Sequence, residues 1–421
     1  MQTVAEELMV TLGARPIGVV TPVKNNRQAV DLRWAEDADT GDVRLTESFA
    51  AIPGIAPDRA RVSRFLGGYL PEGNQRTAMA TQRDIAADDL FGFLREYGGS
   101  LAGALRFHED TAAASYQRMT PTMLRRAFDE ATDRHNLGAR EDSRSMIPGF
   151  QPKILVAKLG DGHWYQPHGS AHSTHILKPA RENATPRLHD EFYGHELARA
   201  VGLASFHSEI LKSAGIPYLA IERYDRRLNA DTVEVIHQED SAQAMGLDWT
   251  SDDAKFQDPR RPRDRRRASA YAITEVLAAL DGDPVGTWLR QLAFRVLIGD
   301  NDGHAKNVSI LHQENDDRVA DLYDAVPNLF QEGRVNWDMA LAFDGVFDHR
   351  NLTRGRLLRE AESWGVARAS RLEAALDDVF DRFDAALDSV PFPHAGSPAV
   401  PETLRWNLNR LRSGREIGVR S

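Results

Sequence analysis

Residues 299–311 of this chain of 421 residues read GDNDGHAKNVSIL, and they follow the apolar run WLRQLAFRVLI at 288–298. The apolar run has the periodicity of a buried helix, whereas the stretch after Asn307 has strand character. We therefore expect 299–311 to be a polar loop between a helix and a strand. Because Asp, Asn and Gly dominate ordinary turns, a loop that only caps these two elements is the alternative.

Four polar residues in and after this loop suit phosphate chemistry. Asp302 can orient a hydroxyl nucleophile and accept its proton, while Asn307 offers a neutral oxygen to Mg²⁺. Lys306 can offset phosphate charge beside them. Asp324, in DLYDAVPNL at 321–329, is a candidate second metal ligand, with an ordinary turn carboxylate as the alternative. The pairing of Asp324 with Asp302 and Asn307 favours the metal site.

The composition of the chain limits its function classes. Hydrophobic residues make up 42% and charged residues 27%, which is the range of globular proteins. The net charge of -10 argues against broad nonspecific wrapping of nucleic acid, which needs a dominant basic surface. No cysteine occurs, so disulfides, thiolate nucleophiles and cysteine zinc sites are excluded. No apolar run approaches the ~20 residues that span a bilayer, so we expect a cytoplasmic protein without a membrane partner.

Changes of pattern along the chain predict three regions. Residues 1–110 read as short strands followed by helices, which is typical of a small α+β unit. Residues 111–225 carry three strands, a helix and a further strand, with the strands in an antiparallel sheet. Residues 226–421 are mainly helical. The expected fold class is therefore α+β, in a chain that exceeds the usual size of one hydrophobic core.

The middle region carries a candidate nucleotide-binding lysine. Lys178 lies at the end of STHILKP, residues 173–179, where its ammonium can neutralise nucleotide phosphates. A lysine on an edge strand is the alternative. Glu191, in the next predicted helix, is favoured as the charge partner of Lys178, with Glu196 on the same helix as a rival.

Other patterns carry weaker signals or exclude chemistry. In SMIPGFQPK at 145–153, Gly149 and backbone N–H groups near a lysine can cradle phosphate oxygens, although the Walker A pattern is absent. The run DPRRPRDRRR at 258–267 is densely basic, and we favour a solvated loop over a binding role. The 14 histidines lack zinc-protease spacing and no G-x-S-x-G elbow occurs, so hydrolase chemistry has little support.

An ordered series of motifs resembles the HipA family of serine/threonine kinases, the toxin halves of bacterial toxin and antitoxin pairs. The motifs are FLGGYLPEGNQR at 65–76, YGGSLAGALRF at 97–107, PGFQPK at 148–153, HILKP at 175–179, DEFYGHELARAVGL at 190–203, LAIERYDR at 219–226, IHQEDSAQAMG at 236–246, IGDNDGHAKN at 298–307 and LYDAVPNL at 322–329. They extend from the N-terminal region to the predicted catalytic loop.

The resemblance implies a bilobal protein-kinase-like fold with an added N-terminal α+β subdomain and an α-rich C-terminal lobe. It implies ATP held between the lobes and phosphorylation of a protein serine or threonine. By position, Asp302 looks like the catalytic aspartate, and Lys178 like the phosphate-binding lysine. The remaining positions that match family motifs are the metal-binding Asn307 and Asp324, the phosphate-loop Gln151 and Lys153, Glu222 at the interlobe hinge, and Asp240 as structural support.

The resemblance also implies partners. These are a HipB-like helix-turn-helix antitoxin, operator DNA reached only through the antitoxin complex, and a protein substrate for which an aminoacyl-tRNA synthetase is the expected class. A catalytically idle corepressor that only binds the antitoxin is the competing interpretation. The intact Lys178, Asp302, Asn307 and Asp324 argue against it. A small-molecule or lipid phosphotransferase shares the same catalytic parts, and the lack of a membrane-binding stretch disfavours a lipid acceptor.

Members of this family autophosphorylate a serine just ahead of the phosphate loop, and this chain departs from their register. Met146 occupies the position three residues before Gly149, where relatives have the serine. Ser145, one residue earlier, and Ser143 are therefore the autophosphorylation candidates.

Overall fold

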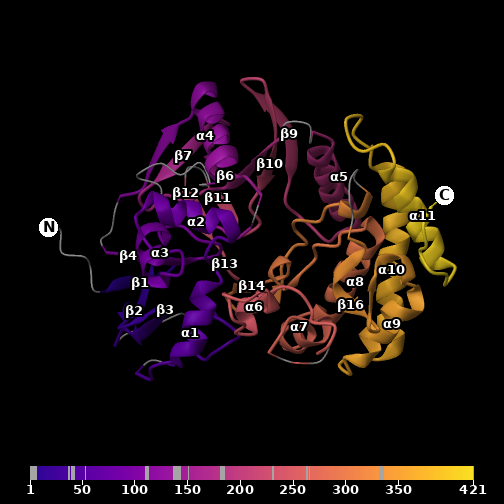
Figure 1. Ribbon diagram of the computed structural model, residues 1–421, viewed down its shortest axis with the longest axis horizontal. Helices are drawn as coiled ribbons and strands as arrows, with labels where there is room; N and C mark the ends of the chain where they lie inside the picture. Colours follow the sequence, from indigo (N-terminus) through magenta and orange to yellow (C-terminus); the bar gives the residue numbers. More distant parts are fainter. Residues whose placement is uncertain are drawn as a thin grey trace. The chain divides into compact units, whose positions relative to one another are not determined.

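The computed structural model describes residues 7–36, 38, 43–52, 54–109, 113–135, 144–149, 151–180, 185–229, 232–261, 264, 266–330 and 336–420 (Figure 1). The chain divides into two compact units. Unit 1 comprises Met1–Arg181, Ile210–Glu239 and Leu311–Asn315, and unit 2 comprises Glu182–Glu209, Asp240–Ile310 and Asp316–Ser421. The predicted domain ranges 1–110, 111–225 and 226–421 stay a prediction.

Unit 1 begins with a four-stranded sheet in the order β3-β2-β1-β4. Helices α1 and α3 pack on it, and buried Phe65, Phe93 and Phe107 contribute to its core. The elements are β1 (Leu8–Leu12), β2 (Arg15–Val23), β3 (Asn26–Trp34), α1 (Arg59–Gly67), α2 (Gly73–Gln82), α3 (Leu90–Tyr97) and β4 (Leu105–His108). The expected order of strands followed by helices is confirmed, with β4 returning to the same sheet.

A second sheet of six strands has the order β5-β7-β6-β8-β10-β9. Its strands are β5 (Ser115–Arg118), β6 (Ile154–Lys158), β7 (Trp164–His168), β8 (His175–Pro179), β9 (Ser208–Ser213) and β10 (Ile216–Glu222). Helix α4 (Pro121–Arg134) packs on β6, and Phe128 lies in the core between them. The Thr120 hydroxyl accepts the Met123 N–H, so threonine and proline start α4 as their order predicts.

A buried ion cluster follows β10 in unit 1. Asp225 is 2% exposed and accepts hydrogen bonds from the guanidinium groups of Arg223 at 2.7 Å and Arg226 at 2.8 Å. Burial acts to raise the pKa of Asp225, but the two arginines outweigh it and the pKa is lowered. Asp225 also accepts the Gly103 N–H at 2.8 Å, so the cluster fixes the 101–104 turn. The short hairpin β11 (Arg226–Asn229) and β12 (Thr232–Val235) comes next.

Unit 2 is rich in helices, as expected for the C-terminal region. Its helices are α5 (Thr185–Val201), α6 (Ser241–Ala244), α7 (Ala270–Leu277), α8 (Pro284–Ile298), α9 (Arg354–Ser363), α10 (Ala369–Ser389) and α11 (Val400–Arg412), with 3-10 turns η1 (Asp252–Ala254), η2 (Ala305–Asn307), η3 (Asn328–Phe330) and η4 (His349–Asn351). Of the remaining short strands, β15 (Asp316–Val319), β16 (Asp338–Phe343) and β17 (Val346–Asp348) lie in unit 2, whereas β13 (His237–Asp240) and β14 (Ser309–Gln313) each have residues in both units.

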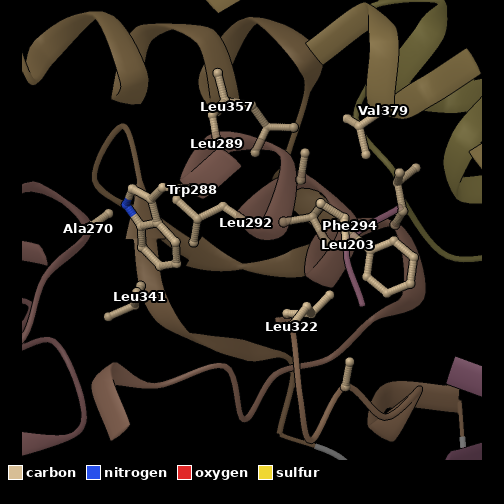
Figure 2. Packing of buried hydrophobic residues seen from close by; sticks show 14 of the residues in the cluster. Leu203, Ala270, Trp288, Leu289, Leu292, Phe294, Leu322, Leu341, Leu357 and Val379 are labelled. Carbon is tan, nitrogen blue, oxygen red and sulfur yellow. The ribbon is translucent and has the colours of Figure 1, made fainter. Parts of the chain in front are cut away.

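Helix α8 lies at the centre of the unit 2 core. It packs against α7, α10 and α11, and its Trp288 and Phe294 are fully buried. Figure 2 shows α8 side chains in the middle of the cluster, with side chains from other elements around them. Because this helix is apolar on nearly all sides, it is a rigid support for the loop that follows it. No helix within the described ranges is long and apolar enough to cross a bilayer.

Candidate active site

The polar loop at 299–308 begins where α8 ends in a left-handed cap at Gly299, with φ 67°. The next residue, Asp300, is 0% exposed, and it forms an ion pair with Arg295 from the last turn of α8, which is 1% exposed. Asp300 also accepts the Asp302 N–H at 3.2 Å. The predicted helix, loop and strand are confirmed, and a buried ion pair holds the start of the loop.

Arg295 ties the two chain segments of the site together. Its Nη2 donates to the carbonyl oxygens of Asn307 at 2.9 Å and Tyr323 at 3.1 Å. A Cβ on Gly303 would lie 2.4 Å from the Arg295 Cδ, so only glycine lets the loop approach this side chain. Arg295 therefore sets the path of the loop and of the chain entering Asp324.

Asn307 and Asp324 are both placed by their local backbone. The Asn307 Nδ2 donates to the Asp302 carbonyl at 2.8 Å, which leaves the side-chain oxygen as the acceptor group. The Tyr323 hydroxyl donates to the Lys306 carbonyl at 2.8 Å and so links the loop to the residue before Asp324. Asp324 has φ 52°, a left-handed conformation that costs roughly 1–3 kcal/mol in a residue with a Cβ and that is enriched at functional sites.

Three carboxylates act on one another in this site. Burial raises the pKa of Asp302, and the charges of Asp300 and Asp324 also raise it, while Lys255 and Arg295 lower it, for a net value of about 7. The Asp302 side chain is 59% exposed, so solvent weakens the effect of burial and the carboxylates account for the direction. Burial raises the pKa of Asp300 to about 6 despite Arg295. The site thus holds mutually repelling negative charge.

Such a group of donors fits Mg²⁺. Carboxylate and amide oxygens are the protein ligands that this cation prefers, and it is held by one or two carboxylates together with substrate phosphates. A divalent cation would also relieve the repulsion among Asp300, Asp302 and Asp324, which adds to the raised pKa of Asp302. Asp302, Asn307 and Asp324 are thus brought together in unit 2 with chemistry suited to a metal and phosphate, and their roles stay predictions.

The predicted nucleotide contacts Lys178 and Glu222 lie in unit 1. Lys178 is in β8, which has β6 and β10 as neighbours, so it is not on an edge strand. It pairs in register with Leu219, and Glu222 at the end of β10 pairs with His175. Glu191 is buried on α5 in unit 2, with the His195 Nε2 at 3.9 Å from its Oε1. The pairing of Lys178 with Glu191 stays a prediction.

The predicted phosphate loop, 145–153, belongs to unit 1, and its residue 150 lies outside the described residues. The Lys153 Nζ donates to the Pro148 carbonyl at 3.1 Å, and Gly149 has φ 120°. A Cβ on Gly149 would lie 2.3 Å from that Nζ, so the lysine covers the glycine. Gln151 is half-buried beside it. The loop thus places Lys153 directly over Gly149, so the lysine contacts its own loop in this structure.

The two autophosphorylation candidates differ in what the structure describes. Ser145 is 6% exposed and forms a parallel bridge with Ser100. The Ser100 N–H donates to the Arg144 carbonyl at 3.0 Å, and the Met146 N–H donates to the Ser100 carbonyl at 3.2 Å. Ser143 lies outside the described residues. The hydroxyl of Ser145 is thus buried in a segment held by its backbone on both sides.

The chain matches known proteins over most of its length. Residues 8–108 match the HipA N-terminal domain and residues 145–387 match the HipA-like C-terminal domain. The chain belongs to the HipA family. It is 31% identical to a protein of Sinorhizobium fredii named "Putative kinase Y4mE", over 69% of each chain. It is 25% identical to the serine/threonine-protein kinase toxin HipA of Shewanella oneidensis, over 80% of this chain and 81% of that one.

A solved structure has a similar fold. The Shewanella oneidensis complex of HipA, HipB and operator DNA contains a chain that matches with a TM-score of 0.79 at 21% identity, over 95% of each chain. That likeness shows the fold. The expectations of a HipA-family member, an α+β kinase-like fold and a serine/threonine kinase as the enzyme class are confirmed.

Sequence reasoning missed three charged residues of this HipA-family site. Asp300 stands in the quoted loop, and its place directly after a glycine cap was a usable signal. Arg295 was the only charged residue in the last eight positions of an apolar helix, which indicates a buried ion pair. Lys255, whose charge lowers the pKa of Asp302, lies far from the loop in sequence, and no sequence pattern linked it to the site. Asp240 forms a capping box with Gln243 on α6, in keeping with its expected structural role.

Proposed function

We propose that this chain is an ATP- and Mg²⁺-dependent serine/threonine protein kinase that acts as a HipA-like toxin. The observation that carries the proposal is the arrangement of Asp302, Asn307 and Asp324 around the Arg295 and Asp300 ion pair. Family membership supplies the kinase class, and this arrangement supplies a place for the chemistry. Kinase sites work mainly by positioning and charge stabilisation, which a rigid loop on a buried helix provides.

In the proposed reaction the oxygen of an acceptor serine or threonine forms a bond to the γ-phosphorus of ATP. The bond from that phosphorus to the β–γ bridging oxygen breaks, and ADP leaves. Asp302 orients the hydroxyl and receives its proton. A carboxylate beside the proposed metal ligands is placed to hold the acceptor hydroxyl in position and to take its proton as the new bond forms.

Asn307 and Asp324 would hold Mg²⁺, which when bound neutralises phosphate charge. The Asn307 amide nitrogen is engaged by the Asp302 carbonyl, so its oxygen is the group offered to the metal. Lys306 is proposed to offset phosphate charge from the same loop. Lys178, with Glu191 as its partner, Gly149, Gln151, Lys153 and the backbone at Glu222 are the proposed nucleotide contacts.

The test is phosphate transfer from [γ-³²P]ATP to a dephosphorylated bacterial lysate by the purified chain and its Asp302→Asn variant. We expect the variant to bind nucleotide like the original chain and to lose transfer by at least a hundredfold, because only the base is altered. Asp316→Asn is the matched control, since Asp316 is half exposed on the β15 strand and forms a surface ion pair with Arg318. Near-normal transfer by Asp302→Asn would reject the assignment.

The same assay distinguishes an active kinase from the competing interpretation, a catalytically idle corepressor. An original chain that binds ATP and transfers no phosphate would leave antitoxin binding as its function. A HipB-like antitoxin is proposed as the partner because the related solved complex contains HipA, HipB and operator DNA. Co-purification of this chain with a tagged HipB-like helix-turn-helix protein tests the partner. The protein substrate proposed is a translation component such as an aminoacyl-tRNA synthetase.

Autophosphorylation at Ser145 is proposed with a structural requirement. A buried hydroxyl cannot receive phosphate where it lies, so the bridge to Ser100 has to open first. After incubation with Mg²⁺ and ATP, mass spectrometry is expected to find phosphate on Ser145. The Ser145→Ala variant should carry no phosphate at position 145. An active preparation without phosphate on Ser145 or Ser143 would contradict this part of the proposal.

A further inference from the structure

A segment distant in sequence, residues 252–257, packs against the loop that carries Asp302. The Ala305 N–H donates to the Lys255 carbonyl at 3.1 Å. The ring of Phe256 meets the ring of His304 edge to face, with the centroids 5.4 Å apart and the planes at 87°. His304 is two residues from Asp302 in the chain. The 252–257 segment therefore forms one side of the proposed transfer site within unit 2.

This segment is held rigidly. Its first residues form η1, and the Ala268 N–H donates to the Asp253 carbonyl at 3.1 Å. At the other end the Gln257 N–H donates to the Ala340 carbonyl at 3.1 Å, and the Gln257 side chain accepts the Ala342 N–H at 2.8 Å. Gln257 and Ala254 are buried. Because both ends are anchored, the position of Phe256 is set by the fold.

Phe256 is an exposed aromatic residue in this rigid setting, with 42% of its surface accessible. A single exposed hydrophobic residue is ordinary on a protein surface, so exposure alone indicates nothing. Val366 and Val419 are the other exposed large hydrophobics described in unit 2, and they follow α9 and α11. Phe256 differs from them because its ring contacts the loop of the proposed catalytic aspartate.

Lys255 adds charge at the same place. The Lys255 carbonyl accepts the Ala305 N–H at 3.1 Å, which places this lysine beside the loop of Asp302, and its ammonium acts on that carboxylate. Positive groups next to a transferred phosphoryl group stabilise the charge that spreads over its oxygens. A segment that presents a cation and an apolar ring side by side matches a phosphorylated hydroxyl with an apolar neighbour.

We propose that the 252–257 segment is the acceptor-recognition element: Phe256 contacts a large apolar side chain close to the phosphorylated serine or threonine, and Lys255 supplies positive charge beside Asp302. The occupant is thus a protein acceptor with an apolar residue near its hydroxyl. This inference rests on the proposed kinase function. It adds a sequence preference that the catalytic residues themselves do not provide.

The first test maps phosphorylation sites that the full chain makes in a dephosphorylated bacterial lysate. We expect large apolar residues to be enriched near the serine or threonine, and the enrichment to be lost with Phe256→Ala. For a synthetic peptide copied from the strongest site, kcat/KM should fall about fivefold to tenfold, the effect of uncovering part of one aromatic side chain. The KM for ATP should not change. Phe256→Leu should keep the preference, and Val366→Ala is the matched control.

Two results would overturn the inference. One is the absence of apolar enrichment in the sites of the original chain, and the other is the same enrichment in Phe256→Ala. A parallel fall in ATP affinity and thermal stability would indicate a structural role instead. An original chain that labels no protein would refute the kinase function itself, so the two failures are distinguishable.

Lys255 is tested by a charge series on the same peptide. Lys255→Met should lower kcat by at least tenfold with little change in the peptide KM, because the cation acts on the transferring group. Lys255→Arg keeps the charge and should recover most of the rate. Equal rates for the original chain and Lys255→Met, or no recovery with arginine, would remove Lys255 from the proposal.

Discussion

Replacing Arg295 with methionine is expected to destabilise unit 2 strongly at neutral pH. The side chain is 1% exposed, its ion-pair partner Asp300 is 0% exposed, and two carbonyl oxygens accept from the same guanidinium. Removing one partner of a buried pair costs about 3–5 kcal/mol, because the remaining charge is buried without compensation. The unpaired carbonyls of Asn307 and Tyr323 add to this loss, so we expect about 4 kcal/mol or more.

The loss should depend on pH in a defined direction. Burial raises the pKa of Asp300 to about 6 in the folded chain, against about 3.9 when unfolded. Between these values the folded state binds more protons, so the Asp300 contribution to stability falls as pH rises through this window. Arg295 lowers that pKa, and without it the window extends to higher pH. The variant should therefore lose more stability at pH 8 than at pH 5, where Asp300 is protonated.

Urea denaturation followed by circular dichroism at pH 5 and pH 8 measures both effects. Arg382→Met is the matched control, because Arg382 is 54% exposed and its ion pair with Asp378, at 2.8 Å, lies on the surface. Such a pair contributes about 0–1 kcal/mol. A loss below about 1 kcal/mol for Arg295→Met at pH 8, or a larger loss at pH 5, would refute the reasoning.

Three further predictions concern single sites. Carbon-13 NMR of the metal-free chain should show Asp302 titrating above the usual carboxyl range, and Mg²⁺ with nucleotide should lower its pKa. An ordinary carboxyl pKa in the metal-free chain would contradict the repulsion among the three carboxylates. Gly149→Ala should weaken ATP binding, measured by calorimetry, by at least tenfold, because the Cβ of the alanine would displace Lys153. Unchanged binding would exclude this loop from the nucleotide site. Asp225→Asn should lower the free energy of unfolding by about 3 kcal/mol, because it leaves two buried arginines without an anionic partner. An unchanged urea midpoint would contradict this prediction.

Local patterns in the chain determined the secondary structure of the site in advance. The apolar period of 288–298, the glycine cap and the strand-like end of 299–311 are short-range signals, and the structure has α8, the loop and β14 in that order. The threonine and proline start of α4 is a similar case. These features are readable because helix periods, caps and turns depend on residues only a few positions apart.

Candidate ligands were readable for the same reason, as Asp302 and Asn307 share one loop. The sequence allowed two interpretations of Lys178, a nucleotide-binding lysine and a lysine on an edge strand, because one strand does not encode its place in the sheet. Only the sheet shows that β8 has a neighbour on each side. Lys255 and Phe256 were missed because their only link to the site is a contact made by folding.

The sequence by itself thus determined which elements form and which side chains offer oxygen and ammonium groups to phosphate. The tertiary structure alone decided that Arg295 and Asp300 are buried together, that Gly303 makes room for that arginine, and that Asp324 adopts a left-handed backbone. It also decided the pKa of Asp302, because that value depends on charges brought near it from distant parts of the chain. Burial and charge proximity are sums over neighbours in space, and no local pattern of residues contains them.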